Sequence, residues 1–326
     1  MAWQKFQLGK RNKPDVLQFG YNLEDNIFRL RQELKTETYQ HSNYTSFYIE
    51  DPKLRHIHKA CVKDRVLHHA VFRILYPIFD KTFIFDSYSC RIKKGTHRAV
   101  NRLQKFARKV SKNNTENCFI LKCDIRKFFA SIDHIILLET LQQYIPDRNI
   151  LWLLRNVIES FSSTRPGIGL PLGNLTSQLL VNIYMNEFDQ FVKHKLKIKH
   201  YIRYCDDFVV FGESREFLEK LIPQISRFLK EELKLFLHSN KISIRKHHQG
   251  VDFLGYISFP HHRLLRTKTK RRMFKKIEQR VKELKRGEIS DKSFNQSIQS
   301  YLGILKHCDS HKLRQKLKNQ IQQQMK

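Results

Sequence analysis

Two adjacent aspartates, Asp206 and Asp207, stand between two short runs of residues that favour β-structure. Residues 201–204 precede the pair and residues 208–211 follow it, so the acids fall where a tight hairpin would turn. Neighbouring carboxylates repel one another unless a cation neutralises them, and the pattern therefore indicates a divalent-metal site. Enzymes that displace a phosphate group in line use such a site to hold the attacking and leaving oxygens. An ordinary Asp-Asp turn is the alternative interpretation.

The strong excess of basic residues narrows the range of partners. The 326 residues include 61 Lys and Arg against 31 Asp and Glu, a formal net charge of +30. Hydrophobic residues make up 40% of the chain, which is enough to build a folded core. A folded chain this basic is expected to bind a polyanion, because each neutralised phosphate releases counterions. A structural RNA-binding protein would share this charge, so the charge alone does not indicate an enzyme.

The cysteine pattern and the N-terminus bear on the expected location. The six cysteines include no C-x-x-C pair and no zinc-binding spacing. The N-terminus lacks an apolar signal core, and no apolar stretch is long enough to span a bilayer. We therefore expect free thiols, a cytoplasmic location and no membrane partner.

Hydrophobic spacing predicts the order of the main elements. Helices are expected over residues 22–33, 64–78 and 216–233, from Asn174 onward, and in three stretches after residue 261. Extended segments are expected at residues 47–49, 118–125, around Lys241 and at 253–256. Lys and Arg crowd the helices that follow residue 261. Such a basic bundle suits the backbone of a nucleic-acid duplex, with a solvated charged face as the alternative.

Six segments of the chain form an ordered set of motifs. They are residues 124–134 (DIRKFFASIDH), 169–178 (GLPLGNLTSQ), 204–207 (YCDD), Lys241, 253–256 (FLGY), and a group formed by Lys53, Arg55, Asp64-Arg65 and Ser89-Cys90-Arg91. The set resembles reverse transcriptases, specifically the bacterial and phage group that belongs to diversity-generating retroelements. The first three segments are similar to the catalytic motifs, the next two to later motifs and the last group to motifs of the fingers. The order and spacing agree from about residue 50 to 260, and more loosely beyond.

The resemblance implies a fold and a domain organisation. The expected fold is the α+β, right-hand polymerase fold, with mixed fingers, a palm that carries an antiparallel sheet, and an α-helical thumb. Residues 1–115 would form the N-terminal segment and fingers, and residues 116–260 the palm, with finger elements near 140–175. Residues 261–326 would form the basic thumb. We expect no RNase H domain, maturase extension or H-N-H endonuclease.

The resemblance also implies catalytic residues. The metal site for two Mg²⁺ ions, which Mn²⁺ could replace, would comprise Asp124 at a strand end, Ile125, Asp206 at a hairpin tip and Asp207. The three aspartates would be catalytic, with Asp207 beside the metals and contributing less to coordination. Lys241 matches the position proposed to protonate the pyrophosphate leaving group. Asp133 is expected to serve the structure by holding a nearby basic side chain.

A second group of residues would bind the incoming deoxynucleoside triphosphate. Lys53 and Arg55 match residues that contact the triphosphate, because a point charge and a planar fork both suit phosphate oxygens. Phe129 matches the residue that packs under the sugar and excludes a 2′-hydroxyl, which favours DNA synthesis. Phe128 is the expected core aromatic, since adjacent strand residues point to opposite faces. Leu172 and Gly173 would lie beside the nascent base pair.

A third group would hold the primer and template. Residues Phe253, Leu254, Gly255 and Tyr256 resemble the primer grip, where Gly255 would let two backbones approach closely. Arg271, Arg272, Lys275 and Lys276 are the thumb cations expected to contact the RNA/DNA hybrid.

Two departures from the common motif point to the subgroup. Leu172 stands where most reverse transcriptases carry Gln, and Gln178 follows Ser177 where most carry Pro. Both substitutions are characteristic of the diversity-generating group, and the Pro-Gln-Gly typical of retron enzymes is absent. The implied function is to copy a template-repeat RNA into error-prone cDNA mutagenised at adenines.

The implied partners are template RNA, the RNA/DNA hybrid, deoxynucleotides and a small basic oligomeric accessory protein. A stand-alone reverse transcriptase of antiphage defence is the first alternative. An RNA-binding scaffold with an inactive palm is the second. The template RNA, the priming mode, the oligomeric state and the cause of adenine selectivity do not follow from the sequence.

Overall fold

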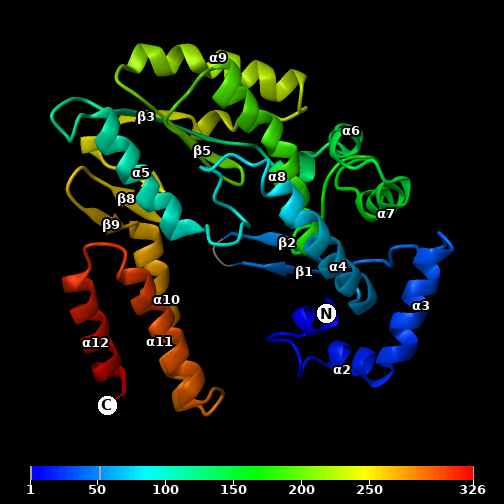
Figure 1. The fold of residues 1–326 in the computed structure, drawn as a ribbon. Coiled ribbons are helices and arrows are strands. Elements are labelled where there is room, and N and C mark those ends of the chain that lie inside the picture. The colour runs from blue at the N-terminus through cyan, green and yellow to red at the C-terminus, as the bar shows by residue number, and fades with distance from the viewer. Residues whose placement is uncertain (1, 51–52, 326) are drawn as a thin grey trace. The chain divides into compact units, whose positions relative to one another are not determined.

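The computed structural model describes residues 2–50 and 53–325 and shows a mixed α+β protein (Figure 1). The described residues divide into two compact units that the chain enters alternately. The first unit comprises residues 1–93, 123–208 and 221–242, and the second comprises residues 94–122, 209–220 and 243–326. None of the described helices is long and apolar enough to cross a membrane.

The first unit is built on two helices that pack against each other, α4 (Val62–Phe79) and α8 (Leu175–Gln190). Helix α8 is buried on nearly all sides, and the polar residues Asn182, Asn186 and Asp189 are buried among its apolar side chains. The first unit also contains the helices α1 (Ala2–Phe6), α2 (Pro14–Tyr21), α3 (Leu23–Lys35), α6 (His134–Tyr144) and α7 (Arg148–Glu159). A π-helical segment, Phe191–Lys195, extends α8. A two-stranded antiparallel hairpin of β1 (Thr45–Ile49) and β2 (Arg55–Lys59) precedes α4, with Phe47 opposite Ile57.

The second unit contains a three-helix group and a small sheet. Helix α10 (Thr267–Lys285) packs against α11 (Asp291–Leu305) and α12 (His311–Met325), and these helices lie side by side in Figure 1. Met273, Ile277 and Val281 form the buried stripe of α10 at helical spacing. The sheet has the order β7 (Val251–Phe253), β8 (Tyr256–Ser258), β9 (Arg263–Leu265), and α5 (Thr96–Val110) contacts β8.

A four-stranded sheet carries the central motifs. Its order is β4 (Tyr201–Tyr204), β5 (Asp207–Gly212), β3 (Phe119–Asp124), β6 (Ser243–Lys246). Strands β3 and β6 are antiparallel, with Phe119 opposite Lys246. Phe208 to Phe211 are all buried, as expected of a strand covered on both faces. Helix α9 (Arg215–Glu231) follows β5.

The predicted helices and most predicted strands are confirmed, and three local expectations are wrong. Lys241 ends a short 3-10 helix, Ser239–Lys241, and the strand begins only at Ser243. Residues Phe128–Ser131 form another 3-10 helix, not a strand. Leu254 and Gly255 form the turn of the β7–β8 hairpin, with positive φ angles of 50° and 90°. A turn with positive φ at both central residues matches the right-handed twist of the flanking strands.

Candidate active site

The hairpin of β4 and β5 presents Asp206 at its tip. Only Cys205 and Asp206 separate the two strands, and Cys205 adopts a left-handed φ of 59° that allows the tight turn. The Asp206 carbonyl accepts a hydrogen bond of 3.2 Å from the amide of Ile125, the residue that follows β3. Sheet pairing therefore brings the end of β3 to the hairpin tip, as the sequence predicted for a strand that ends on Asp124.

Asp124 is held from both its backbone and its side chain. Its carbonyl accepts a hydrogen bond from the His238 amide at 2.8 Å. Its Oδ1 atom lies 2.6 Å from Nζ of Lys241, which forms an ion pair and donates a hydrogen bond. Lys241 thus reaches Asp124 from the 3-10 helix that precedes β6, although the two residues are far apart in the chain.

The electrostatic environment couples these residues. Burial raises the pKa of Asp206, and the charge of Asp124 raises it further. The charges of Lys241 and Arg55 act in the opposite direction. Asp207, the first residue of β5, contributes with Asp124 to the raised pKa of the Cys123 thiol, about 12, for which burial is the largest cause. Asp124 is thus the charged residue that raises the pKa of Asp206, whereas Lys241 and Arg55 lower it.

The donor set at this point fits a hard divalent cation. Asp124 and Asp206 supply carboxylate oxygens, the ligands that Mg²⁺ prefers. Within residues 2–50 and 53–325, no three or more His, Cys, Asp or Glu side chains are arranged to hold a metal. Mg²⁺ in nucleotide enzymes is commonly held by one or two carboxylates together with substrate phosphates, so a pair is sufficient. Ile125 is buried, and its backbone lies against Asp206.

The residues expected to bind the nucleotide converge through the β1–β2 hairpin. Arg55 opens β2 and is exposed, as is Lys53 in the bend just before it. The amide of His58 in β2 donates a 3.0 Å hydrogen bond to the Leu172 carbonyl. Gly173 has a φ of 112°, and a Cβ atom there would lie 3.0 Å from Cγ2 of Ile57. The 169–178 segment therefore contacts β2, the strand that carries Arg55, through a hydrogen bond and close packing.

The two neighbouring phenylalanines occupy different environments. Phe128 is buried, and Phe129 is half-buried with its ring centroid 5.6 Å from that of Phe128. The Phe129 carbonyl accepts a 2.8 Å hydrogen bond from the Leu170 amide. Phe128 is thus the core aromatic, as predicted, but a 3-10 turn separates the two rings instead of strand alternation.

Three other motif residues have structural roles in the first unit. Asp133 caps α6, because its carboxylate accepts hydrogen bonds from the amides of Ile135 and Ile136. The expectation that it holds a basic side chain is therefore wrong. Asp64 is fully buried and accepts a 2.8 Å hydrogen bond from the Tyr39 hydroxyl. Arg91 donates a 2.7 Å hydrogen bond to Asp80.

The segment expected to form the primer grip lies in the second unit. Phe253 and Tyr256 are buried, and the Tyr256 hydroxyl donates a 3.0 Å hydrogen bond to the Ile304 carbonyl in α11. Leu254 and Gly255 form the hairpin turn between them. A Cβ atom on Gly255 would meet only Thr269 Oγ1 at 3.6 Å, an ordinary contact. The Gly255 carbonyl accepts a 3.0 Å hydrogen bond from the Arg266 amide, and the left-handed φ explains the glycine.

The four cations expected to contact the RNA/DNA hybrid lie on the first half of α10. Arg271, Arg272 and Lys275 are exposed, and Lys276 is half-buried and donates a 3.2 Å hydrogen bond to Gln279. They stand on the helix face away from the buried stripe that contains Met273 and Ile277. A cationic face of this kind can contact phosphates.

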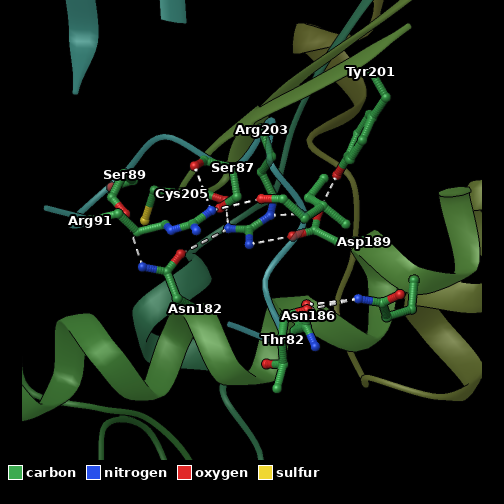
Figure 2. A network of polar contacts seen from close by, with 12 residues as sticks. Thr82, Ser87, Ser89, Arg91, Asn182, Asn186, Asp189, Tyr201, Arg203 and Cys205 are labelled. Atoms are coloured by element: carbon green, nitrogen blue, oxygen red, sulfur yellow. Dashed lines mark hydrogen bonds and ion pairs between the residues drawn. The ribbon is translucent and has the colours of Figure 1, made fainter. Parts of the chain in front are cut away.

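One buried ion pair of the first unit was missed by sequence reasoning. Arg203 in β4 and Asp189 in α8 are both fully buried, and they pair beside the YCDD turn (Figure 2). The available signal was an arginine within a β-forming run, since a buried charge is costly unless a group of opposite charge pairs with it.

Comparisons with known proteins bear on this arrangement. Residues 50–258 match the family described as reverse transcriptase (RNA-dependent DNA polymerase). Protein YkfC of Escherichia coli (strain K12) is 25% identical over 282 residues, which cover 74% of this chain and 71% of YkfC. The group II intron-encoded protein LtrA of Lactococcus lactis subsp. cremoris is 23% identical over 303 residues, which cover 72% of this chain and 49% of LtrA.

A solved structure shares the fold. Telomerase from Candida albicans, solved with a fragment of telomeric RNA, superposes with a TM-score of 0.54 at 13% identity, covering 77% of this chain and 51% of the telomerase chain. This likeness confirms the right-hand polymerase fold. The chain spans about half the length of LtrA and of that telomerase chain. Because the family match covers well over half of its residues, the chain belongs to the reverse transcriptase (RNA-dependent DNA polymerase) family.

Proposed function

We propose that this protein copies a template-repeat RNA into error-prone cDNA, mutagenised at adenines, within a diversity-generating retroelement. The observation that carries polymerase activity is the Asp124–Asp206 carboxylate pair with Lys241 against it. Family membership supports RNA-templated DNA synthesis. The two motif departures, Leu172 and Gln178, support the diversity-generating role.

The residues of this chain divide the work of phosphoryl transfer. Asp124 and Asp206, together with Ile125 and Asp207, would hold two Mg²⁺ ions. When bound, these ions neutralise charge on the phosphates and align the attacking and leaving oxygens. Lys241 supplies a proton to the pyrophosphate leaving group.

Further residues bind the nucleotide and the nucleic acid. Lys53 and Arg55 contact the triphosphate, Phe129 packs under the sugar, and Leu172 and Gly173 border the nascent pair. Residues 253–256 position the primer, and the α10 cations hold the hybrid. In domain terms, residues 1–115 serve as N-terminal segment and fingers, 116–260 as palm, and 261–326 as thumb.

Reduced accuracy follows from the chemistry of Leu172. Its carbonyl is already engaged by the His58 amide, and its half-buried side chain carries no donor or acceptor. A Gln at this position could hydrogen-bond to the nascent pair. Loss of about 1–3 kcal/mol of discrimination corresponds to roughly ten- to two-hundred-fold more misincorporation. Leu172 alone does not explain why adenine is singled out.

Primer extension on an RNA template tests the polymerase activity. Asp206→Asn should abolish deoxynucleotide incorporation and leave RNA binding intact, because a ligand is lost while the basic surface remains. Equal extension by the wild type and this variant would overturn the active-site assignment. A wild type that binds RNA but extends no primer would favour the scaffold alternative.

Sequencing of the cDNA tests the diversity-generating role. Leu172→Gln should lower the error rate at template adenines, and Leu172→Met, of similar volume and without an amide, should not. A uniformly accurate wild type would favour the antiphage-defence alternative. Equal error rates in the three proteins would remove Leu172 from the fidelity mechanism.

An accessory protein forms a separate part of the proposal. The proposed partner is small, basic and oligomeric, and co-purification with the polymerase and its RNA should recover it. Recovery of only the polymerase and its RNA would count against it.

A further inference from the structure

The Arg203 guanidinium is fully buried in the first unit, and each of its three nitrogens donates a hydrogen bond. Its Nε atom donates to Oδ1 of Asp189 at 2.8 Å, and its NH2 atom donates to Oδ2 at 2.6 Å. The Tyr201 hydroxyl also donates to Asp189 Oδ1 at 2.8 Å. This bidentate geometry offsets the cost of burying both charges.

The remaining nitrogen of Arg203 reaches the catalytic turn. Its NH1 atom donates to the Cys205 carbonyl at 3.2 Å and to Oδ1 of Asn182 at 3.2 Å (Figure 2). Cys205 is the residue of the turn with a left-handed φ, and its carbonyl group belongs to the peptide bond that links it to Asp206. A non-glycine residue with positive φ persists where its surroundings hold it. Arg203 supplies such a hold at the peptide that carries Asp206.

The same network extends away from the turn. Asn182 donates from Nδ2 to the Ser89 carbonyl at 2.9 Å. The backbone of Arg203 pairs with the 86–88 segment, through the Arg203 amide to the Asp86 carbonyl and the Tyr88 amide to the Arg203 carbonyl. Arg203 therefore joins three parts of the first unit: its guanidinium contacts α8 and the turn after β4, and its backbone pairs with the 86–88 segment.

A fixed turn is needed because Asp124 repels the carboxylate of Asp206. The Asp206 carbonyl accepts a 3.2 Å hydrogen bond from the Ile125 amide, so the turn lies against the residue that follows Asp124. A turn free to move would relieve this repulsion by separating the two carboxylates. A turn that is fixed by the hydrogen bond from Arg203 to the Cys205 carbonyl keeps the two carboxylates close enough to share a cation.

We propose that Arg203, held by Asp189, is a positioning residue that fixes the Cys205–Asp206 turn and so keeps the Asp206 carboxylate beside Asp124. This inference rests on the proposed role of Asp206 in metal binding. Arg203 itself touches neither substrate nor metal. Its removal should therefore weaken metal binding and slow catalysis without changing the catalytic groups.

The test uses two forms of the full-length protein that alter the network. Arg203→Lys keeps the buried charge but loses the planar fork that reaches Asp189 and Cys205 together. The double variant Arg203→Met with Asp189→Leu replaces the ion pair by apolar side chains, a change that proteins often tolerate without loss of stability. Tyr201→Phe is the control, because it removes a hydrogen bond to Asp189 and leaves the contact with Cys205 in place.

Mn²⁺ binding by electron paramagnetic resonance and the Mg²⁺ dependence of primer extension are the readouts, below the melting temperature of each variant. Arg203→Lys and the double variant should bind Mn²⁺ about 10- to 100-fold more weakly, need correspondingly more Mg²⁺, and show a lower kcat. Tyr201→Phe should match the wild type. Wild-type metal binding in Arg203→Lys would overturn the inference even if its melting temperature fell, and this variant decides if the double variant does not fold.

The outcome for Asp206→Asn separates this inference from the proposed function. If Asp206→Asn retains activity, the proposed site is wrong. If Asp206→Asn is inactive while Arg203→Lys responds to metal like the wild type, only the positioning role is wrong.

Discussion

Nζ of Lys241 lies 2.6 Å from Oδ1 of Asp124, so a side-chain cation is paired with one of the two carboxylates assigned to metal binding. Lys241 is 38% exposed and Asp124 14% exposed, so the pair lies at the edge of the solvent. A metal ion that binds Asp124 competes with this ammonium group. The same ammonium group is the proposed proton donor for the pyrophosphate leaving group.

Lys241→Met should separate these two effects. The rate constant of single-nucleotide incorporation should fall about 10²- to 10⁴-fold, the range of a lost general acid. The apparent affinity for Mn²⁺ should rise, because the competing cation is gone. Rapid-quench extension and a metal titration measure the two quantities. Lys230→Met, at an exposed position of α9, is the control and should change neither. An unchanged rate constant would remove Lys241 from the chemistry.

Asp206 should destabilise the metal-free protein at neutral pH. Its raised pKa means that the native state keeps a proton at pH values where the unfolded chain has lost it. The free energy of unfolding therefore falls as pH rises from the ordinary aspartate pKa through the raised value, and it stays lower above that window.

Asp206→Asn should accordingly raise the melting temperature in EDTA at neutral pH. The difference from the wild type should disappear below about pH 4, where the carboxyl is protonated in both states. Thermal unfolding across this pH range is the measurement. Asp25→Asn, at an exposed position of α3, is the control. A lower melting temperature for Asp206→Asn at neutral pH would contradict the electrostatic coupling to Asp124.

Phe129→Ala should admit ribonucleotides. Removal of the half-buried ring opens space beneath the sugar, and the ratio of kcat/KM for deoxynucleotides to that for ribonucleotides should fall roughly 10- to 200-fold. Steady-state incorporation of each nucleotide type measures the ratio. Phe128→Ala should instead cost about 3–5 kcal/mol of stability, because Phe128 is a buried core side chain. If the preference survives Phe129→Ala, Phe128 becomes the candidate for the gate.

Neutralising the α10 cations should reduce the salt dependence of hybrid binding. Replacing Arg271, Arg272, Lys275 and Lys276 by Gln should make the slope of log K against log[salt] shallower by up to about 0.9 for each phosphate that the protein no longer neutralises. Fluorescence anisotropy with an RNA/DNA duplex measures the slope. A matched control neutralises the exposed lysines at 230, 312, 316 and 318. Equal slopes for the α10 variant and the wild type would show that the duplex contacts a different surface of the protein.

Local pattern determined much of this protein. The stripe of Met273, Ile277 and Val281 predicts α10, because burial of one helix face has a period that is visible in the residues. Acids between two β-forming runs predict the hairpin that carries Asp206. The ordered motifs predict the family and the fold, since they specify which segments belong to one sheet.

Tertiary structure decided which side chains meet. Lys241 pairs with Asp124, and Arg203 pairs with Asp189 and reaches Cys205, only because sheet pairing and helix packing bring distant segments together. Phe128 and Phe129 differ in burial through a 3-10 turn that no strand alternation predicts. The physical reason is the separation along the sequence of the residues that interact. Periodicity records the environment of neighbouring residues, whereas a buried ion pair depends on contacts that form only when the whole core is assembled.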